Sequence, residues 1–329
     1  MMKAIVYHRY GSPDVLRYQD IETPPVGDDH VRIKVRAASI NPLDWHQMRG
    51  TPYIMRLSGG LRIPKWTQLG LDLAGHVEAV GKNVSQFKPG DEVFGAYIRA
   101  GALAEYACAP ASALALKPSN VTFDQAAAVP VAALTALLGL RDKGHVQPGQ
   151  RVLINGAAGG VGTFAVQIAK WLGAHVTGVC RQGNVETVRS IGADQVIDYT
   201  QQDFAASGER YDVLLDAVGN RSLFEFLRTL KPTGICILVT GPNGRVLGPL
   251  GRFVRAWALS PFVSRKLVPF MARPNKDDLP LLQALMRAGK VVPIIDRCYP
   301  LSDAPEAIRY LEAGHARGKV IITIGGTTA

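Results

Sequence analysis

The glycine-rich turn at Arg151–Gly162, which reads RVLINGAAGGVG, has the residue types that can bind a phosphate group. Before it, Val152–Asn155 have the composition of a short buried strand, and after it Thr163–Leu172 show helical spacing. Glycines let the backbone turn tightly and approach a ligand closely, and a helix N-terminus offers unpaired N–H groups with a partial positive charge. The pattern therefore indicates a site for the pyrophosphate of a dinucleotide.

The spacing of this turn is a variant of GxGxxG, because it can be read as AxxGxG from Ala157 or as GxxGxxG from Gly156. Such a pattern is weak alone, and an ordinary glycine-rich connection is the alternative. Its context adds specificity, since a strand precedes it, a helix follows, and a second strand is expected at Ala174–Cys180. We therefore predict a nicotinamide-type cofactor. The predicted contacts in the turn are Ala158, Gly159, Gly160, Val161 and Gly162.

The end of the second strand indicates which dinucleotide is bound. Enzymes that use NAD usually place Asp or Glu there, where the carboxylate binds the ribose 2′-hydroxyl. This strand instead ends in Val-Cys-Arg-Gln-Gly-Asn at residues 179–184, without an acid. Arg181 can pair with a 2′-phosphate, and the missing carboxylate removes a repulsion from that phosphate. We therefore expect NADPH rather than NADH.

Length and composition indicate a globular protein of about two domains. The chain has 329 residues, of which 47% are hydrophobic and 19% charged, far from the composition of disordered chains. No apolar run reaches the ~18 residues of a membrane span, and the N-terminal MMKAIVYHRYG has no secretory h-region. The four cysteines form no CxxC pair, which favours reduced thiols. We expect a cytoplasmic protein without a membrane span.

The net charge of +10 is compatible with a nucleic acid, a membrane surface or an anionic cofactor as partner. Gly241–Lys276 holds seven Arg and Lys residues, no acid and interleaved apolar residues. Such a stretch could contact a membrane or a nucleic acid. We interpret it instead as a basic amphipathic insertion at 242–276, either a helical flap over a substrate pocket or a subunit contact. We expect no nucleic-acid partner, because a polyphosphate cofactor already gives a basic protein an anionic ligand.

The predicted secondary structure changes along the chain, from mainly strands to alternating strands and helices. The first part alternates strands with frequent Pro and Gly, which indicates a β-rich domain ending near Lys117–Asn120. Thr122 or Asp124 then caps a helix, and a second helix at Ala132–Lys143 ends at Gly144. Short apolar strands alternating with helices follow, which is typical of a doubly wound parallel sheet. The expected strands are Val152–Asn155, Val176–Cys180, Gln195–Asp198, Val213–Asp216, Cys236–Thr240 and Val291–Ile295.

The end of the chain returns to the style of the first part, with a helix expected at Ala304–Ala313 and a strand at Lys319–Ile324. We therefore predict an α/β protein in which a nucleotide-binding domain is inserted into a catalytic domain. The catalytic domain is expected to cover 1–123, with 296–329 returning to it. The nucleotide-binding domain is expected to cover 124–295, including the basic insertion.

Short motifs follow one another in a specific order over nearly the whole chain. They are Ala37–Asp44 (AASINPLD), Gly75–Gly81 (GHVEAVG), Phe87–Gly95 (FKPGDEVFG), Ala128–Ala136 (AVPVAALTA), the INGAAGGVG turn, Gly192–Tyr199 (GADQVIDY), Tyr211–Gly219 (YDVLLDAVG) and Gly314–Val320 (GHARGKV). In this order they resemble the medium-chain dehydrogenase/reductase superfamily, in its zinc-independent quinone-oxidoreductase-like branch. The resemblance implies a GroES-like β-barrel catalytic domain, a Rossmann domain, an active site in the cleft between them, and a homodimer.

The resemblance raises the question of zinc, because many relatives carry a catalytic Zn²⁺ that polarises a substrate oxygen. This chain has Asn41 near the position of their Cys, and Leu71 and Asp72 replace their His-Glu pair. Their four-cysteine lobe is absent too. A site at His46, Asp72 and His76 is the alternative, but it lacks a thiolate. We therefore expect no metal.

Without a metal, the expected chemistry is hydride transfer from C4 of the nicotinamide to an acceptor activated by hydrogen bonds. A quinone or an α,β-unsaturated carbonyl suits this reaction. By resemblance, Asn41, Asp44 and Tyr53 are the candidate catalytic residues, and they lie with Trp45 on a loop that faces the nicotinamide. Tyr53 is the candidate proton donor and Asn41 the candidate ribose anchor, and packing or turn roles are the alternatives. Trp45 and Trp257 are assigned to the substrate pocket.

The resemblance also extends the cofactor site beyond the glycine-rich turn. Thr135 matches the family threonine at the nicotinamide end, and Tyr199 matches the family tyrosine near the 2′-phosphate. Lys319 would add positive charge near the cofactor, with a solvated basic turn as the alternative. The other residues assigned to this site are Asn184, Val218, Gly219, Val239 and Gly241.

Two other functions are compatible with these residues. An enoyl thioester reductase of the same superfamily would use the basic insertion to approach an acyl-carrier substrate. A low-turnover NADPH-binding protein would instead bind a partner through its positive surface. Turnover of a quinone or enone, compared with turnover of a crotonyl thioester, separates the three.

Overall fold

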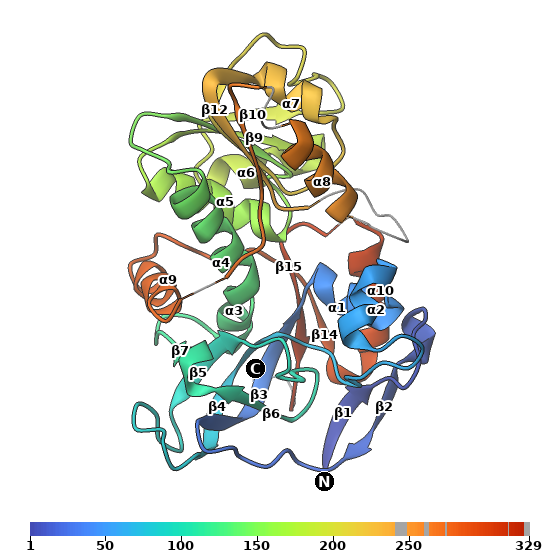
Figure 1. Ribbon diagram of the computed structural model, residues 1–329. Coiled ribbons are helices and arrows are strands. Elements are labelled where there is room, and N and C mark those ends of the chain that lie inside the picture. Colours follow the sequence, from blue (N-terminus) through green and yellow to red (C-terminus); the bar gives the residue numbers. More distant parts are fainter. Residues whose placement is uncertain (241–248, 260–262, 274, 315, 326–329) are drawn as a thin grey trace. The chain divides into compact units, whose positions relative to one another are not determined.

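The chain folds into two compact units in the computed structural model (Figure 1). Unit 1 consists of Met1–Ala132 together with Asn275–Ala329, and unit 2 consists of Ala133–Pro274. Unit 2 is thus one continuous stretch that interrupts unit 1. The structure describes residues 1–240, 249–259, 263–273, 275–314 and 316–325.

Unit 2 is built on a six-stranded sheet in the order β10-β9-β8-β11-β12-β13, in which all neighbours are parallel. The strand order reverses between β8 and β11. Ligands of such open sheets bind at the carboxyl ends of the strands near a reversal. The strands are β8 (Arg151–Asn155), β9 (His175–Cys180), β10 (Gln195–Asp198), β11 (Tyr211–Asp216), β12 (Leu230–Leu238) and β13 (Lys266–Pro269).

The sixth strand corrects the sequence prediction. It is β13, which lies inside the basic insertion, and not Val291–Ile295. Pro293 interrupts that apolar run, and the chain continues into β14 (Ile295–Pro300), which pairs with β15 (Lys319–Thr323) in unit 1. The basic insertion therefore contributes a strand to the parallel sheet, which the interpretation as a flap or a subunit contact did not include.

Helices connect the strands of unit 2. They are α5 (Gly160–Trp171), α6 (Val185–Ser190), α7 (Leu223–Thr229) and α8 (Pro249–Leu259). The helix predicted at Ala132–Lys143 is observed as α4 (Pro130–Leu138) followed by a π-helical turn at Gly139–Lys143. Among the helices that the structure describes, none has the length and apolar composition needed to cross a membrane.

Unit 1 contains a seven-stranded sheet in the order β14-β15-β3-β4-β5-β7, with β6 also paired to β3. The long strand β3 (His30–Ile40) is its centre, because it pairs with β4, β6 and β15. Val320 of β15 lies opposite Ile40, so the end of the chain joins the sheet of its first part. The other strands are β4 (Asp72–Val80), β5 (Glu92–Ala96), β6 (Tyr106–Pro110) and β7 (Leu114–Leu116), and β1 (Met2–Val6) pairs with β2 (Arg17–Ile21).

The helices of unit 1 include one that the sequence assigned elsewhere. Residues 275–295 group with unit 1, because α9 (Asp278–Arg287) lies at β7 and Asn120 Nδ2 donates to Met286 O at 3.1 Å. Thr122 caps α3, since its hydroxyl accepts from Gln125 N at 3.2 Å. The helices are α1 (Pro42–Arg49), α2 (Arg56–Gly59), α3 (Phe123–Ala127), α9 and α10 (Ala304–Glu312).

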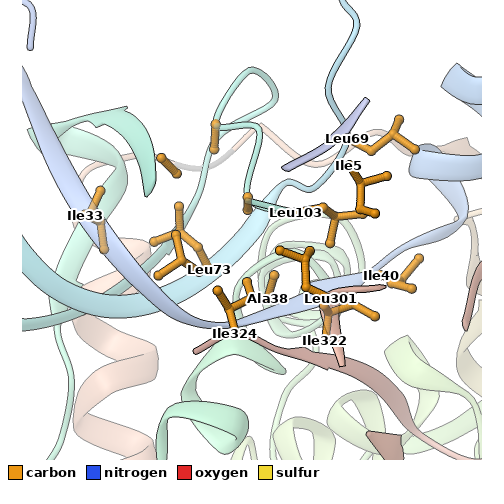
Figure 2. Packing of buried hydrophobic residues seen from close by; sticks show 14 of the residues in the cluster. Ile5, Ile33, Ala38, Ile40, Leu69, Leu73, Leu103, Leu301, Ile322 and Ile324 are labelled. Carbon is orange, nitrogen blue, oxygen red and sulfur yellow. The ribbon is translucent and has the colours of Figure 1, made fainter. Parts of the chain in front are cut away.

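The core of unit 1 is apolar and draws on distant parts of the sequence (Figure 2). Ile5, Ile33 and Leu73 come from the first strands, whereas Leu301 and Ile322 come from the end of the chain. All five are buried. Their burial removes apolar surface from water, and this is the main free energy that holds the end of the chain in place.

Candidate cofactor and active-site residues

The glycine-rich turn between β8 and α5 has the geometry of an anion-binding loop. Gly156 has a φ of +87°, which side chains rarely adopt. A Cβ on Gly162 would lie 2.0 Å from Gly156 O, so glycine is required for the first turn of α5 to approach the strand end. The amides of Gly160 and Val161 lie in that first turn, where an α-helix has no preceding carbonyl to accept them. These amides are therefore available to an anion.

Asp216, the last residue of β11, holds the loops next to this turn. Its buried Oδ1 accepts from Asn155 Nδ2 at 2.7 Å, Gly219 N at 3.1 Å and Val218 N at 3.2 Å. Its backbone carbonyl accepts the Val239 amide at 3.1 Å. Three predicted cofactor residues, Val218, Gly219 and Val239, are thus brought together by one aspartate.

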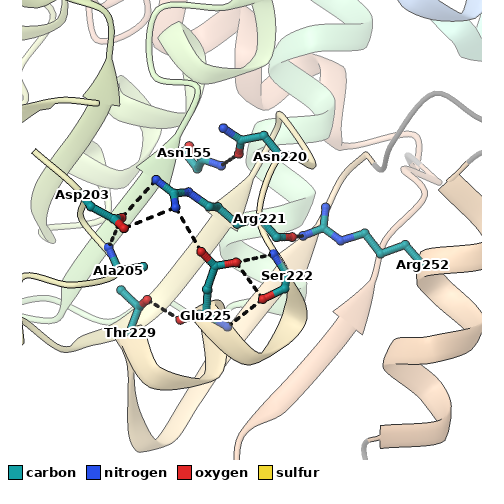
Figure 3. Close-up of polar contacts among 9 residues, drawn as sticks. All are labelled: Asn155, Asp203, Ala205, Asn220, Arg221, Ser222, Glu225, Thr229 and Arg252. Atoms are coloured by element: carbon teal, nitrogen blue, oxygen red, sulfur yellow. Dashed lines mark hydrogen bonds and ion pairs between the residues drawn. The ribbon is translucent and has the colours of Figure 1, made fainter. Parts of the chain in front are cut away.

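Arg252 of α8 supplies the counter-charge of Asp216. Its Nη1 donates to Asp216 Oδ2 at 2.6 Å and contacts Thr240 O at 3.3 Å. Its Nη2 donates to Arg221 O at 3.2 Å (Figure 3). The guanidinium is almost wholly buried and lies 5.1 Å from the centre of the Phe226 ring. Arg252 therefore ties α8 to the loops that follow β11 and β12.

Sequence reasoning missed Asn155, Asp216 and Arg252 as organising residues. Asn155 and Asp216 are the polar last residues of β8 and β11, and each directly follows three apolar residues. This pattern is a signal that they lie at the ligand-binding edge of the sheet. Arg252 was treated as one of seven cations in the basic insertion. Its position on the buried side of an amphipathic helix distinguishes it from them.

Arg181 and Tyr199 lie next to each other at the carboxyl ends of β9 and β10. Cys180 and Asp198 are paired in register, and each predicted residue is the next one along its chain. Tyr199 N donates to Cys180 O at 3.0 Å, and both side chains are exposed. The Asp198 carboxylate accepts the backbone N–H of Thr200 at 3.0 Å. Among the described residues no ion pair involves Arg181, so its charge is available at this edge.

The other predicted residues of unit 2 are distributed around the sheet. Thr135 lies on α4, and Asn184 lies just after β9, where its N–H donates to Arg181 O at 2.9 Å. Trp257 lies on the outer side of α8 and is 77% exposed. Gly241 lies outside the described residues.

A second buried polar cluster lies in unit 1 around Asp72, at the start of β4. Asp72 Oδ2 accepts from Ser39 Oγ at 2.7 Å and Asn41 Nδ2 at 2.9 Å, and Oδ1 accepts the Val131 amide at 2.9 Å. Lys319 Nζ donates to Asn41 Oδ1 at 2.7 Å and lies 3.4 Å from Asp72 Oδ2. From the sequence, Lys319 was assigned to the cofactor site. In the structure its side chain is buried, and its ammonium faces Asn41 and Asp72.

Asp44, assigned as catalytic, is fully buried in the first turn of α1. Its Oδ2 accepts Asn41 N at 2.7 Å and its Oδ1 accepts Gly70 N at 2.9 Å. Burial raises the pKa of Asp44 to about 7, although the two N–H donors oppose this shift. With both oxygens on backbone donors, Asp44 fixes the loop before α1 to the segment before β4.

The aromatic residues predicted beside the nicotinamide lie on and after α1. Tyr53 is exposed, and the Arg56 guanidinium lies 4.8 Å from its ring centre. Trp45 is half-buried and stacks on His46 with ring centres 3.6 Å apart. His46 Nδ1 lies 2.7 Å from Thr51 O, and burial lowers the pKa of its imidazole. Tyr53 is therefore the member of this group with an accessible polar tip.

The described residues contain no group of three or more His, Cys, Asp or Glu side chains that could hold a metal ion. Of the alternative zinc ligands, Asp72 has both oxygens engaged by the cluster of unit 1, and His46 contacts Thr51. His76 lies on β4, with Nε2 3.7 Å from Glu92 Oε1.

Two family models match the chain. Residues 27–119 match the alcohol dehydrogenase GroES-like domain, and residues 191–322 match the family described as zinc-binding dehydrogenase. A chloroplast quinone-oxidoreductase homolog of Spinacia oleracea is 34% identical, over 98% of both chains. A mitochondrial NAD(P)H oxidoreductase of Bos taurus, RTN4IP1, is 37% identical over 98% of this chain and 89% of the relative. A chloroplast NADPH-dependent alkenal/one oxidoreductase of Arabidopsis thaliana is 35% identical over 98% of this chain and 79% of the relative.

Solved structures of similar proteins agree with these matches. The quinone oxidoreductase of Coxiella burnetii has a TM-score of 0.85 and 32% identity, with 98% of this chain and 99% of that chain covered. The Escherichia coli quinone oxidoreductase complexed with NADPH has a TM-score of 0.83 and 26% identity, with the same coverage. The similarity therefore extends over both units.

Proposed function

Because this chain belongs to the medium-chain dehydrogenase/reductase superfamily, in its quinone-oxidoreductase-like branch, we propose that it uses NADPH to reduce a quinone or an α,β-unsaturated carbonyl without a metal. Its relatives establish an oxidoreductase with a nicotinamide cofactor and a small-molecule substrate. The choice of NADPH, the absence of a metal and the identity of the acceptor are the parts we propose.

The observation that carries this proposal is the carboxyl edge of the parallel sheet in unit 2. This edge suits a dinucleotide, because Gly162 lets the first turn of α5 pack against the backbone of Gly156, and the turn offers the first amides of α5. The exposed Arg181 stands where an NAD enzyme would have an acid. A guanidinium at this place suits a 2′-phosphate, and residues 181–184 directly after β9 include no acid that would repel it.

The chain's own residues divide the work as follows in this proposal. The amides of Gly160 and Val161 bind the pyrophosphate, and Arg181 binds the 2′-phosphate. The Tyr53 hydroxyl donates a hydrogen bond to the acceptor oxygen, where negative charge develops as the acceptor is reduced. Asp44 and Asn41 position the loop that carries Tyr53. When bound, reduced nicotinamide supplies the hydride.

The metal-free part of the proposal is supported by the state of Asp72. This carboxylate accepts three hydrogen bonds and faces Lys319, so both of its oxygens already bind donors of the protein. We expect less than about 0.1 equivalent of zinc per chain after purification without chelator, and unchanged turnover after chelation. One zinc per chain, with turnover lost to the chelator, would contradict this part.

Steady-state turnover tests the proposal as a whole. NADPH oxidation is measured with a simple quinone, an enone and a crotonyl thioester at equal concentrations, and again with NADH. We expect the highest kcat/KM with NADPH and the quinone or enone. Preference for the thioester would favour an enoyl thioester reductase. Tight NADPH binding without turnover of any acceptor would favour a binding protein.

A further inference from the structure

Large apolar side chains are exposed in one short segment of unit 1. Of the seventeen exposed large hydrophobic residues among those the structure describes, five lie within eleven consecutive positions, before, in and after α2 (Figure 1). Leu57, Leu61 and Ile63 are 74%, 67% and 72% exposed. Tyr53 and Ile54 are the other two. Such clustering differs from the single exposed apolar residues that any protein surface carries.

Aromatic and cationic side chains connect this segment to the loop after β5. Lys65 Nζ and Arg99 Cζ lie 5.9 Å and 4.9 Å from the centre of the Trp66 ring. A Cβ on Gly59, at the end of α2, would lie 3.8 Å from Trp66 Cζ3. Ile98, next to Arg99, is exposed as well. We call residues 53–66 with Ile98 and Arg99 the apolar-basic surface.

The charge of this surface is of one sign. The chain has no Asp or Glu between Asp44 and Asp72, and it carries Arg56, Arg62 and Lys65 there. Arg62, Lys65 and Arg99 are exposed, and the ion pairs recorded for the described residues include none of them. Their charge is therefore not neutralised within the described part of the chain.

We propose that the apolar-basic surface binds the headgroup region of an anionic phospholipid bilayer. Exposed Leu and Ile side chains can enter the boundary between headgroups and acyl chains, and Lys and Arg can remain with the lipid phosphates. Trp66, between two cations, has the amphipathic character that favours this boundary. An acidic protein would satisfy the cations but would leave no reason for three aliphatic side chains exposed beyond 60%.

Binding to the bilayer would place the protein where a lipid-soluble quinone is concentrated, and this consequence rests on the proposed function. The binding itself does not, because it requires no turnover. Reduction of a water-soluble quinone without vesicles tests the function alone, and vesicle binding without substrate tests the surface alone. Failure of one experiment is therefore distinguishable from failure of the other.

Flotation with lipid vesicles tests the proposal. The full-length protein is mixed with vesicles of phosphatidylcholine alone or with about 30% phosphatidylglycerol, at low and at high salt. We expect binding only to the anionic vesicles. Binding should decrease strongly at high salt, because salt shortens the distance over which the cations are attracted to the lipid phosphates. Arg62→Gln with Lys65→Gln should weaken binding about tenfold or more, and Leu57→Ser, Leu61→Ser and Ile63→Ser together should do the same.

Matched variants control for net charge and for lost apolar surface. Arg287→Gln with Lys290→Gln removes two exposed charges at the end of α9, and Phe224→Ser removes an exposed apolar residue of α7. Both should bind anionic vesicles within about twofold of wild type. All variants change exposed side chains, so their melting temperatures should match.

Three results would overturn the proposal. Absence of binding to anionic vesicles would leave an acidic protein or a second copy of this chain as the occupant. Equal loss in the control variants would indicate attraction through net charge alone. Binding that is lost on Arg255→Gln with Trp257→Ser in α8, and kept in the variants of the apolar-basic surface, would assign the contact to the basic insertion.

Discussion

Each unit contains a fully buried carboxylate paired with a cation from a later part of the chain. In unit 1, Asp72 faces Lys319, and in unit 2, Asp216 pairs with Arg252. Both carboxylates also accept backbone amides. Burying a charge is costly unless it is paired and hydrogen-bonded, so both clusters satisfy the same physical requirement.

The two clusters differ in what they hold. The side-chain partners of Asp72 come from or adjoin strands that are already paired, namely β3 and β15. The partners of Asp216 lie at the end of β8, in the turn after β11 and on α8, next to the predicted cofactor residues. The first cluster therefore stabilises a sheet, whereas the second fixes the shape of loops. The same kind of charge pair can thus hold strands together in one place and fix loops beside a candidate cofactor site in another.

Replacing Arg252 or Lys319 should give the largest loss of stability, and comparing the two variants separates the role in the sheet from the role in the loops. Arg252→Met and Lys319→Met each leave a buried carboxylate unpaired, so each should lower the free energy of unfolding by about 3–5 kcal/mol. Only Arg252→Met should also weaken NADPH binding, by about tenfold or more, because Val218 and Gly219 lose their fixed positions. Denaturant unfolding and fluorescence titration with NADPH measure the two quantities.

A second, milder variant, Arg252→Lys, keeps the prediction testable if Arg252→Met does not fold. It keeps the charge near Asp216 and cannot reproduce the planar fork of contacts to Thr240 O and Arg221 O. It should remain folded and show weaker NADPH binding than wild type. Equal NADPH affinity in wild type, Arg252→Lys and a folded Arg252→Met would show that both clusters are purely structural.

A charge placed in the glycine-rich turn sharpens the contrast in unit 2, because it changes ligand binding and not stability. Gly160→Asp should weaken NADPH binding at least about a hundredfold, since a carboxylate enters the space of the pyrophosphate. An acid in the first turn of a helix is favourable for the helix itself, so the fold should persist. Gln202→Asp, at an exposed position of the same unit, is the control for the added charge. Normal binding by a folded Gly160→Asp would place the pyrophosphate elsewhere.

Arg181 is exposed, whereas Arg252 is buried. Replacing Arg181 should therefore have a smaller effect on dinucleotide affinity than the changes above, and only NADPH should be affected. Loss of one charge-assisted contact to a phosphate costs about 1.5–3 kcal/mol, or ten- to a hundredfold in affinity. Arg181→Ala should therefore lower NADPH affinity by that factor and leave NADH affinity unchanged. The ratio of the two dissociation constants at one fixed salt concentration is the measurement. An unchanged ratio would make Arg181 a solvated surface residue.

Asp44 offers the smallest effect, and it differs from both clusters because no ion pair involves it among the described residues. Burial raises its pKa to about 7 from 3.8, so between these values the folded state holds a proton that the unfolded state lacks. Its contribution to stability is therefore greatest below pH 4 and falls as pH rises to 7, by at most ~1.4 kcal/mol per pH unit. In Asp44→Asn, urea unfolding from pH 5 to 8 should show a shallower decline. The same slope in both proteins would contradict this assignment.

Much of the fold was predictable from the sequence, because each element has its own periodicity. The superfamily and the fold class with its GroES-like and parallel-sheet units are confirmed. Five of the six predicted strands of the parallel sheet occur where apolar runs are bounded by turns. The sixth, β13, was missed because two cations and a proline surround its few apolar residues. This segment is a strand because it pairs with β12, and the local sequence does not show that pairing.

The candidate site was less predictable, because it depends on contacts between distant residues. The glycine-rich turn carries its own signal in its spacing. Lys319 and Asn41 could be recognised only as members of short motifs, and those motifs do not show that both side chains contact Asp72. For Arg252 the sequence showed only a positive charge. The catalytic role of Tyr53, the homodimer and the cytoplasmic location stay predictions.

The pairing of β15 with β3 determines the order in which the chain can be completed during synthesis. Unit 2 is continuous, and the strands of its sheet pair only with one another, so this sheet needs no later part of the chain in order to form. The sheet of unit 1 begins with β3 but waits for Val320 to pair with Ile40. Until then, the edge of β3 and the pocket for Lys319 stay open. The first strands of unit 1 are therefore synthesised early, but their sheet is completed only when β15 has been made. An edge of β3 stays unpaired until then, and an unpaired edge can pair with other chains.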